Sequence, residues 1–172
     1  MIGSQKSKTM VIVITGLPGV GKTTLANSLA PLIEAQVLSS DKIRKELFAR
    51  PTYSKHEKLL VYDVMGLVAK YLNRSGKNCI VDATFNREEF RKRFKERLDL
   101  QDDSFKIVEC RCQEETVLSR LAKRKDKYSD ADIEVYQMMK KMYEPIKMSH
   151  IEIDTSKDPK ENARYLALAI GK

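Results

Sequence analysis

The sequence predicts an α/β fold, a three-layer α/β/α sandwich around a five-stranded parallel sheet. Short apolar runs typical of strands alternate along the chain with amphipathic stretches typical of helices. The first apolar run leads into a glycine-rich stretch, GLPGVGKTT (residues 16–24), and then into a helical pattern. Strands separated by helices pair in parallel through right-handed crossovers, so we expect one sheet covered on both faces. We expect residues 1–9 to be a flexible lead-in and residues 10–172 to form a single domain.

The predicted elements follow one another without a linker that would divide the chain. Apolar runs predict strands over residues 10–15, 36–40, 78–85, 105–112 and 150–156. Helical spacing predicts helices from the glycine-rich stretch to residue 33 and over residues 41–48, 56–74, 86–98, 114–124, 131–143 and 159–170. The helix over 86–98 is so highly charged that we expect a solvated surface with opposite charges four residues apart. We expect the methionines near 138 to pack the helix rather than to form a recognition surface.

The glycine-rich stretch matches the phosphate-binding loop pattern Gly16-x-x-x-x-Gly21-Lys22-Thr23 residue for residue. Small residues let successive backbone N–H groups converge on phosphate oxygens, next to the positive end of the helix dipole. Lys22 is expected to reach the terminal phosphates, and the Thr23 hydroxyl to bind magnesium. A glycine-rich turn without a ligand is the alternative, but four specified residues between a strand and a helix argue against it. We therefore expect a nucleoside triphosphate with Mg²⁺ at Gly16, Leu17, Pro18, Gly19, Val20, Gly21, Lys22, Thr23 and Thr24.

Two carboxylates follow neighbouring strands at the edge where open α/β sheets bind ligands. Asp82 ends the apolar run CIVD, and from there it could hold the magnesium together with Thr23. Asp41 begins the helix after the second strand, with Arg44 three residues later. An aspartate there could accept a proton from an attacking hydroxyl, and the arginine could bind a phosphate of the acceptor. Alternatively, Asp82 caps the helix that follows it, Ser40 or Asp41 caps the helix after the second strand, and Arg44 is a solvated residue.

A basic segment, SRLAKRKDKY, is suited to form a mobile helical lid over about residues 117–131. Arg120 and Arg124 lie four residues apart on one helical face, and Lys125 and Lys127 follow. Phosphoryl transfer needs cations that neutralise the charge of the transferred group. A solvated basic face is the alternative.

The order of these motifs resembles the small P-loop kinases related to polynucleotide kinase, the family that includes predicted AAA-type kinases and zeta-type toxins. The resemblance covers residues 11–143, from the glycine loop through D-x-x-R after strand two, D-A-T after strand three and R-x-x-x-R before a helix. Adenylylsulfate and gluconate kinases are more distant relatives, and the lid spacing here differs from the spacing expected of them. Polynucleotide kinases often carry a second catalytic domain, and we expect none within these 172 residues.

The resemblance implies a role for each matching residue. Asp41 matches the general base, and Arg44 matches the arginine that binds the phosphate of the acceptor. Asp82 and Thr84 match a segment that faces the acceptor and the phosphates. The two lid arginines of the family match Arg120 and Arg124, of which the second contacts donor phosphates.

These residues lead to one main function and two alternatives. The main expectation is ATP-dependent phosphorylation of a polynucleotide 5′-hydroxyl, with ATP and Mg²⁺ as cofactors. The net charge of +8 agrees with a polyanionic acceptor, but only 7% of the residues are aromatic, so no platform for base stacking is evident. The first alternative is a small-molecule kinase acting on a phosphorylated metabolite, nucleotide sugar or antibiotic. The second is a nucleotide-gated ATPase or binding module.

The remaining composition predicts an ordinary cytoplasmic protein. No apolar run is long enough to span a bilayer, and the first residues lack the hydrophobic core of a signal peptide. Cys79, Cys110 and Cys112 fall inside predicted strands, so we expect buried thiols in a reducing compartment. His56 and His150 lack metal-ligand spacing and are expected at surface or loop edges.

Overall fold

The computed structural model describes residues 8–123 and 130–172, and its centre is a five-stranded parallel sheet of order β2-β3-β1-β4-β5. The strands are β1 (Val11–Thr15), β2 (Ala35–Ser39), β3 (Asn78–Asp82), β4 (Phe105–Arg111) and β5 (Ile151–Asp154). The helices are α1 (Lys22–Leu29), α2 (Ser40–Leu47), α3 (Lys55–Arg74), α4 (Glu88–Leu98), α5 (Glu114–Lys123), α6 (Ile133–Met142) and α7 (Pro159–Ala169). Short 3-10 helices, η1 (Ala30–Leu32) and η2 (Asp102–Ser104), precede β2 and β4.

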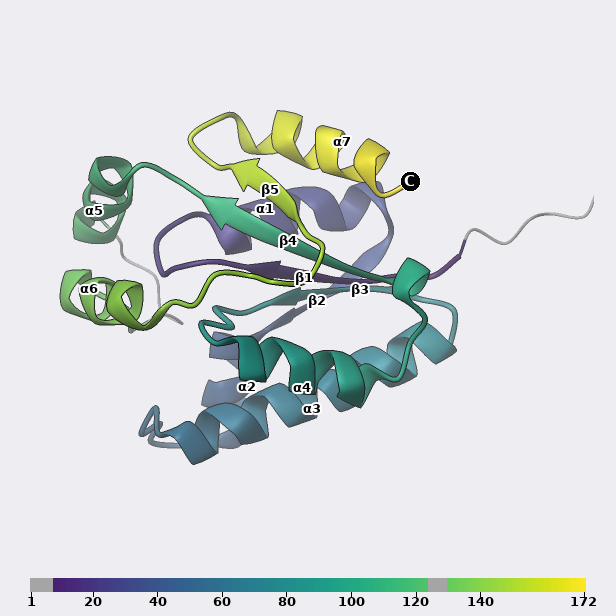
Figure 1. The fold of residues 1–172 in the computed structure, drawn as a ribbon, viewed down its shortest axis with the longest axis horizontal. Coiled ribbons are helices and arrows are strands. Elements are labelled where there is room, and N and C mark those ends of the chain that lie inside the picture. The colour runs from purple at the N-terminus through teal and green to yellow at the C-terminus, as the bar shows by residue number, and fades with distance from the viewer. Residues whose placement is uncertain (1–7, 124–129) are drawn as a thin grey trace, which may run out of the picture.

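Helices cover both faces of the sheet, which confirms the predicted sandwich (Figure 1). Helices α1 and α7 pack together on one face, and α3 packs with α4 and α2 on the other. Strand β1 lies in the middle and all five of its residues are buried, because each of its two faces contacts a layer of helices. One core forms around Ile12 and Ile14, and the other forms around Val11 and Val13.

Most predicted boundaries agree with the structure to within two residues, but the first helix and the third strand end earlier than expected. Helix α1 ends at Leu29 and is followed by the 3-10 helix η1, whereas the prediction ran to residue 33. Strand β3 ends at Asp82 rather than continuing to residue 85. Phe85 has a positive φ of 39°, so the backbone leaves the extended conformation while the phenyl ring stays fully buried. The apolar residues after Asp82 are therefore buried in a loop, which an apolar pattern cannot distinguish from a strand.

The cysteines and the lead-in agree only partly with the expectations. Cys79 and Cys110 are buried, and burial raises the pKa of each thiol to about 12. Cys112 is half-buried. Lys8, at the end of the predicted lead-in, forms an ion pair with Asp103, and residues 1–7 lie outside the described part of the chain. Within the described residues, no helix has the length and apolar character needed to cross a membrane.

Candidate functional site

The glycine loop joins β1 to α1 at the carboxyl edge of the sheet, and Gly16, Gly19 and Gly21 all have positive φ. Gly16 has a φ of 140°, and a Cβ there would lie 2.6 Å from the Cys110 carbonyl oxygen of the neighbouring strand. Gly21 has a φ of 102° and occupies the N-cap position of α1. Lys22 folds back so that its Nζ donates a hydrogen bond to the Leu17 carbonyl oxygen at 2.9 Å. The lysine side chain is thus held against the loop.

Arg120 ties the glycine loop to helix α5 and to the end of β5. Its Nη1 donates to the Val20 carbonyl oxygen at 3.3 Å, and its Nη2 donates to the Thr155 carbonyl oxygen at 2.8 Å. The Thr155 hydroxyl donates to the same Val20 oxygen. The predicted partner of Arg120, Arg124, lies outside the described residues, as does most of the second half of the predicted lid. Arg120 therefore lines the site, but with its guanidinium already bonded to two backbone carbonyls.

Thr23 and Asp82 meet where α1 begins and β3 ends. The Thr23 hydroxyl donates a hydrogen bond of 2.6 Å to Asp82 Oδ2, and Asp82 is 4% exposed. The helix-capping alternative for Asp82 is not observed, because the N-cap of the next helix, α4, is Arg87. A hydroxyl and a carboxylate oxygen together form the hard oxygen donor set that magnesium prefers. The predicted metal residues are thus in direct contact.

Asp41 and Arg44 lie in helix α2. Arg44 forms ion pairs with both Asp41 and Glu57 of α3. Arg44 Nη1 lies 3.5 Å from Asp41 Oδ1, and Arg44 Nε lies 2.9 Å from Glu57 Oε1. Arg44 is 5% exposed, so the alternative of a solvated arginine is wrong. The N-cap of α2 is Ser39 and makes no side-chain cap, so Asp41 does not serve as the cap either. Its side chain is 42% exposed and faces the cavity described below.

The Glu57 carboxylate binds both Arg44 and the backbone of the loop between α2 and α3. Glu57 Oε2 accepts hydrogen bonds from the Thr52 N–H at 2.6 Å and the Thr52 hydroxyl at 2.9 Å. Burial alone would raise the pKa of Glu57, but these bonds, the Tyr53 N–H and the charge of Arg44 together lower it. Tyr53 stacks on the Arg44 guanidinium at 4.9 Å and donates its hydroxyl hydrogen to Asp130. The Arg44 guanidinium therefore contacts Asp41, Glu57 and the ring of Tyr53.

Lys58 and Tyr62 line the same side of the site, one and two turns along α3 from Ser54, the N-cap. Lys58 lies 5.9 Å from the centre of the Phe90 ring, and among the described residues it forms no ion pair. Burial, and then the charges of Arg44 and Arg87, lower the pKa of Lys58. Tyr62 is 6% exposed, stacks on Phe85 and accepts a hydrogen bond from the Phe85 N–H at 3.3 Å. Lys58 and Tyr62 thus place a cation beside an aromatic side chain in the cavity wall.

One cavity of about 860 Å³ joins all of these groups. From the glycine loop and α1, its walls include Pro18, Gly19, Gly21, Lys22, Thr23 and Thr24. From the opposite side they include Asp41, Arg44, Tyr53, Lys58, Tyr62, Asp82 and Thr84. The remaining walls include Arg120, Thr155 and Asn162, and Met138, Met139 and Met142 of α6. Gly16, Leu17 and Val20 shape the loop without lining the cavity; Val20 is 4% exposed and packs in the core.

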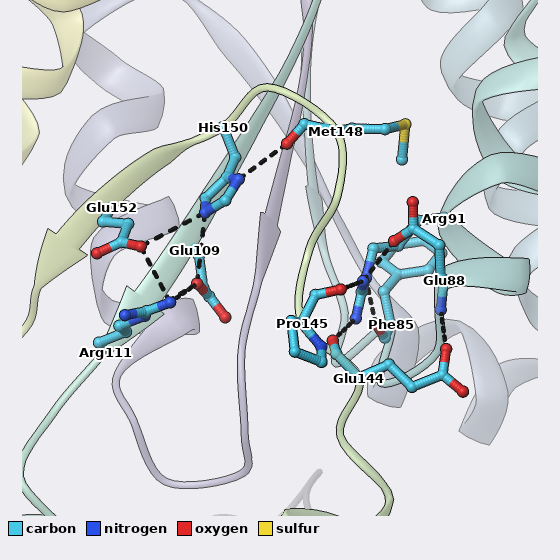
Figure 2. Close-up of polar contacts among 10 residues, drawn as sticks. All are labelled: Phe85, Glu88, Arg91, Glu109, Arg111, Glu144, Pro145, Met148, His150 and Glu152. Carbon is cyan, nitrogen blue, oxygen red and sulfur yellow. Dashed lines mark hydrogen bonds and ion pairs between the residues drawn. The ribbon is translucent and has the colours of Figure 1, made fainter.

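Helix α4 and the methionines of α6 differ from the sequence expectations. Arg91 of α4 is only 2% exposed, although we expected a solvated helix surface. Its Nε donates to the Phe85 carbonyl oxygen at 2.9 Å, and its Nη1 donates to Glu88 at 2.6 Å and to the Pro145 carbonyl oxygen at 3.1 Å (Figure 2). A charge pattern cannot reveal this role, because two of the carbonyl acceptors, those of Glu144 and Pro145, come from a distant segment. Met138 is 51% exposed, so it is not packed into the core as expected.

His150 lies in a cluster of charges rather than alone (Figure 2). Its Nε2 lies 3.6 Å from Glu109 Oε2 and 3.5 Å from Glu152 Oε1. Arg111 lies between the same carboxylates, with its Nη2 at 2.8 Å from Glu109 and 3.0 Å from Glu152. The arginine already balances much of the acidic charge, so the cluster is explained as an ion-pair network that joins β4 to β5.

Sequence reasoning missed Glu57 and Lys58, and only the first left a signal. Ser54 and Glu57 form the S-x-x-E pattern of a capping box, and Ser54 Oγ does accept from the Glu57 N–H at 3.2 Å. The Glu57 side chain departs from that pattern by bonding to Thr52 and Arg44 instead. Lys58 is one of many charged residues in the sequence, and only the fold shows that it faces the cavity.

Comparison with known proteins identifies relatives for most of the chain. The AAA domain model AAA_33 matches residues 11–146. An uncharacterized protein of Mycobacterium tuberculosis is 30% identical over 145 residues, which are 76% of this chain and 29% of that protein. A probable adenylyl-sulfate kinase of Aeropyrum pernix is 26% identical over 166 residues, 92% of this chain and 91% of that protein. The chain thus spans less than a third of the mycobacterial relative but nearly all of the second.

Solved structures with a similar fold include small kinases. A sugar kinase from Janibacter aligns with a TM-score of 0.74 and 16% identity, covering 95% of this chain and 96% of that one. The Mycobacterium tuberculosis APS kinase, in complex with AMPPNP and APS, aligns with a TM-score of 0.73 and 19% identity, covering 95% and 97%. The lid spacing of this chain differs from the spacing expected of adenylylsulfate kinases, but the overall fold is nevertheless similar to that of the APS kinase. The predicted P-loop kinase fold is confirmed, and the chain belongs to the AAA_33 family of AAA domains, with small P-loop kinases as its structural neighbours.

Proposed function

We propose that the protein transfers the terminal phosphate of ATP to a hydroxyl group of an anionic small molecule. The observation that carries this proposal is the shared cavity, which has a phosphate-binding loop on one side and Asp41, Arg44 and Lys58 on the other. A motor or switch would need the loop but not a carboxylate flanked by cations across from it. The named activities of the relatives support the small-molecule reading, because both are kinases of small molecules.

The donor side holds ATP through the glycine loop, Lys22 and the positive end of α1. Thr23 and Asp82 are the residues that would hold magnesium, and their oxygen donors suit that ion. Bound there, magnesium would neutralise part of the charge on the donor phosphates. Lys22 leaves the Leu17 carbonyl and pairs with the phosphates, since a charged acceptor binds an ammonium group more strongly than a neutral one.

On the acceptor side, Asp41 receives the proton of the attacking hydroxyl. The oxygen of the alcohol forms a bond to the terminal phosphorus, and the bond from that phosphorus to the ADP oxygen breaks. The products are ADP and a phosphate ester, while the proton resides on the Asp41 carboxylate until water removes it. Its exposure of 42% leaves this side chain room to meet an alcohol and keeps it in contact with solvent.

Arg44 and Lys58, the two cations on this side of the cavity, favour an acceptor that carries negative charge. Arg44 lies between the carboxylates of Asp41 and Glu57, so much of its charge is balanced within the protein. Lys58 has no such partner among the described residues and lines the cavity beside it. A cation that is partly desolvated and unpaired gains more from an anionic ligand than one exposed to water. A neutral sugar would leave this charge uncompensated.

The test is a transfer assay with labelled ATP, magnesium and a panel of acceptors. The panel contains phosphorylated small alcohols, the matching neutral alcohols, and oligonucleotides with a 5′-hydroxyl. We expect label on at least one phosphorylated small alcohol and little on its neutral counterpart. Labelling of oligonucleotides alone would replace this proposal with a polynucleotide 5′-hydroxyl kinase, which the net charge of +8 also allows. ATP binding without transfer to any acceptor would favour a nucleotide-gated module.

A further inference from the structure

We infer that the acceptor has an aromatic body, and that Met138, Met139 and Met142 of helix α6 form the surface that selects it. This inference rests on the proposed function, because it describes the same acceptor. It adds a second requirement: beside the anionic group that Lys58 and Arg44 attract, the acceptor presents a flat apolar face to the methionines. The three side chains line the cavity together with Val135, and the four lie on one face of α6.

Helix α6 lies over the acceptor side because both of its ends are attached there. Just before the helix, Asp130 accepts a hydrogen bond of 3.0 Å from Lys45 of α2 and another from the Tyr53 hydroxyl. Just after the helix, the Glu144 N–H donates to the Asn86 carbonyl oxygen at 2.8 Å. Asp130 is thus bonded to α2 and to the loop before α3, which carry Asp41, Arg44 and Tyr53 of the cavity wall, and Glu144 is bonded to the loop that follows β3. The helix is also joined to α5, through the ion pair of Lys140 with Glu114.

Buried bonds hold the second attachment in place. Arg91 donates to the carbonyl oxygens of Glu144 and Pro145, and Glu144 Oε2 accepts from the Glu88 N–H at 2.8 Å (Figure 2). Because Arg91 is 2% exposed, these bonds are shielded from competing water. The position of the methionine face relative to Asp41 and Lys58 is thus fixed by the fold at this end.

The methionines have the exposure and chemistry of a binding surface. Met138 is 51% exposed and Met142 is 37% exposed, and both line the cavity. Exposed apolar side chains that line a cavity indicate a ligand whose apolar surface they cover. A thioether contacts an aromatic ring favourably and adapts to its outline. A phosphorylated sugar or polyol would instead place hydroxyl groups against sulfur and methyl groups, where they find no hydrogen-bond partners.

The experiment measures acceptor binding directly, with the donor site saturated by the non-hydrolysable analogue AMPPNP and magnesium. The aromatic probes are AMP, UMP and pyridoxine 5′-phosphate, and the polar probes are ribose 5-phosphate and glycerol 3-phosphate. We expect at least one aromatic probe to bind about tenfold tighter than either polar probe, as burial of a ring predicts. If no aromatic probe binds tighter than the polar ones, the inference is wrong.

Two variants assign the preference to the methionines. The double variant Met138→Ser, Met142→Ser is expected to weaken the aromatic probe about tenfold and the polar probes less than twofold. Gln137→Ser, on the exposed side of the same helix, should change neither. Equal weakening of both classes, or none of either, would overturn the role of the methionines. Because the readout is equilibrium binding, it is independent of phosphate transfer. An aromatic preference without any transfer would refute the proposed function alone, whereas transfer to purely polar phosphates would refute the inference alone.

Discussion

Arg44 and Glu57 form a buried ion pair, with 2.9 Å between Arg44 Nε and Glu57 Oε1 and exposures of only 5% and 4%. The pair connects helix α2, which carries Asp41, to the first turn of α3, which carries Lys58. Glu57 also accepts two hydrogen bonds from Thr52, so the loop between the helices is part of the same unit. The acceptor side of the cavity is thus a preorganised polar network rather than a set of independent surface charges.

Replacing Glu57 by Gln should destabilise the protein. The amide keeps the shape and one hydrogen-bond acceptor but leaves the Arg44 charge buried without its main counter-ion. We expect a loss of about 3 kcal/mol in the free energy of unfolding at pH 7, measured by urea denaturation. Glu46→Gln, an exposed position in the same helix as Arg44, should cost less than about 0.5 kcal/mol.

The same pair predicts how stability depends on pH. The pKa of Glu57 is lower in the folded protein than its ordinary value of 4.5, so the group stabilises the fold above that pH. This contribution is lost as the pH falls from 4.5 toward the folded pKa. The stability difference between the native protein and the Glu57→Gln variant should therefore narrow below pH 4.5. A difference that stays constant between pH 7 and pH 3 would contradict this account.

Lys58→Met should stabilise the protein while weakening acceptor binding. The pKa of Lys58 is lower in the fold than its ordinary value of 10.5, so its charge opposes folding at neutral pH. Removing the charge should raise Tm by about 2–4 °C, an advantage that disappears as the pH rises through the folded pKa toward 10.5. Binding of phosphorylated probes should fall about tenfold or more. Lys58→Arg, which keeps the charge, should retain most of the affinity.

Asp41→Asn should remove phosphate transfer and leave nucleotide binding intact. The amide cannot accept the proton of the attacking alcohol, so kcat should fall by about 10²–10⁴-fold. ATP affinity should change less than about threefold, because the proposed mechanism places Asp41 at the acceptor rather than at the donor. Single-turnover transfer and ATP titration on the same preparation make the comparison. A variant that transfers phosphate at the native rate would remove Asp41 from the mechanism.

Thr23→Ala should weaken the magnesium-dependent part of ATP binding. The substitution removes an oxygen donor and also leaves Asp82 Oδ2 without the 2.6 Å hydrogen bond. ATP at about 100 times its Kd should stabilise the native protein by about 2.7 kcal/mol. We expect magnesium to enhance this stabilisation in the native protein and in Thr23→Ser, but far less in Thr23→Ala. Thermal unfolding with and without EDTA measures the effect, and an equal magnesium response in all three proteins would exclude Thr23 as a ligand.

Gly16→Ala should be far more harmful than the same change at Gly76. Both glycines have positive φ, 140° and 82°, so both substitutions strain the backbone. Only at Gly16 would the new methyl group meet a backbone atom, the Cys110 carbonyl oxygen at 2.6 Å, whereas nothing lies within 4 Å at Gly76. Thermal unfolding should show a larger drop in Tm for Gly16→Ala, with loss of ATP binding. Equal Tm changes would mean that the clash between the new methyl group and the Cys110 carbonyl oxygen of β4 costs little stability.

Local sequence was enough to predict the sheet, the glycine loop and the contact between Thr23 and Asp82. Each of these depends on residues whose positions follow from strand and helix periodicity and from the rule that parallel strands end at one edge. The same reasoning placed Asp41 and Arg44 at this edge, but it could not decide between a role in the site and a role as a helix cap or a solvated residue. Their burial and partners depend on α3, which approaches from a loop whose path no pattern in the sequence specifies.

The tertiary structure alone decided the character of the acceptor side. Glu57, Lys58 and the methionines of α6 come from segments far apart in the chain, and each has an ordinary solvated or core-packing explanation in isolation. Arg91 shows the same limit, since a charged helix reads as solvated until a distant segment supplies carbonyl acceptors at Glu144 and Pro145. Local periodicity specifies which face a residue occupies. What that face contacts depends on long-range packing. The sequence by itself therefore determined a nucleotide-binding α/β fold. Only the tertiary structure determined which residues lie across the cavity from the glycine loop.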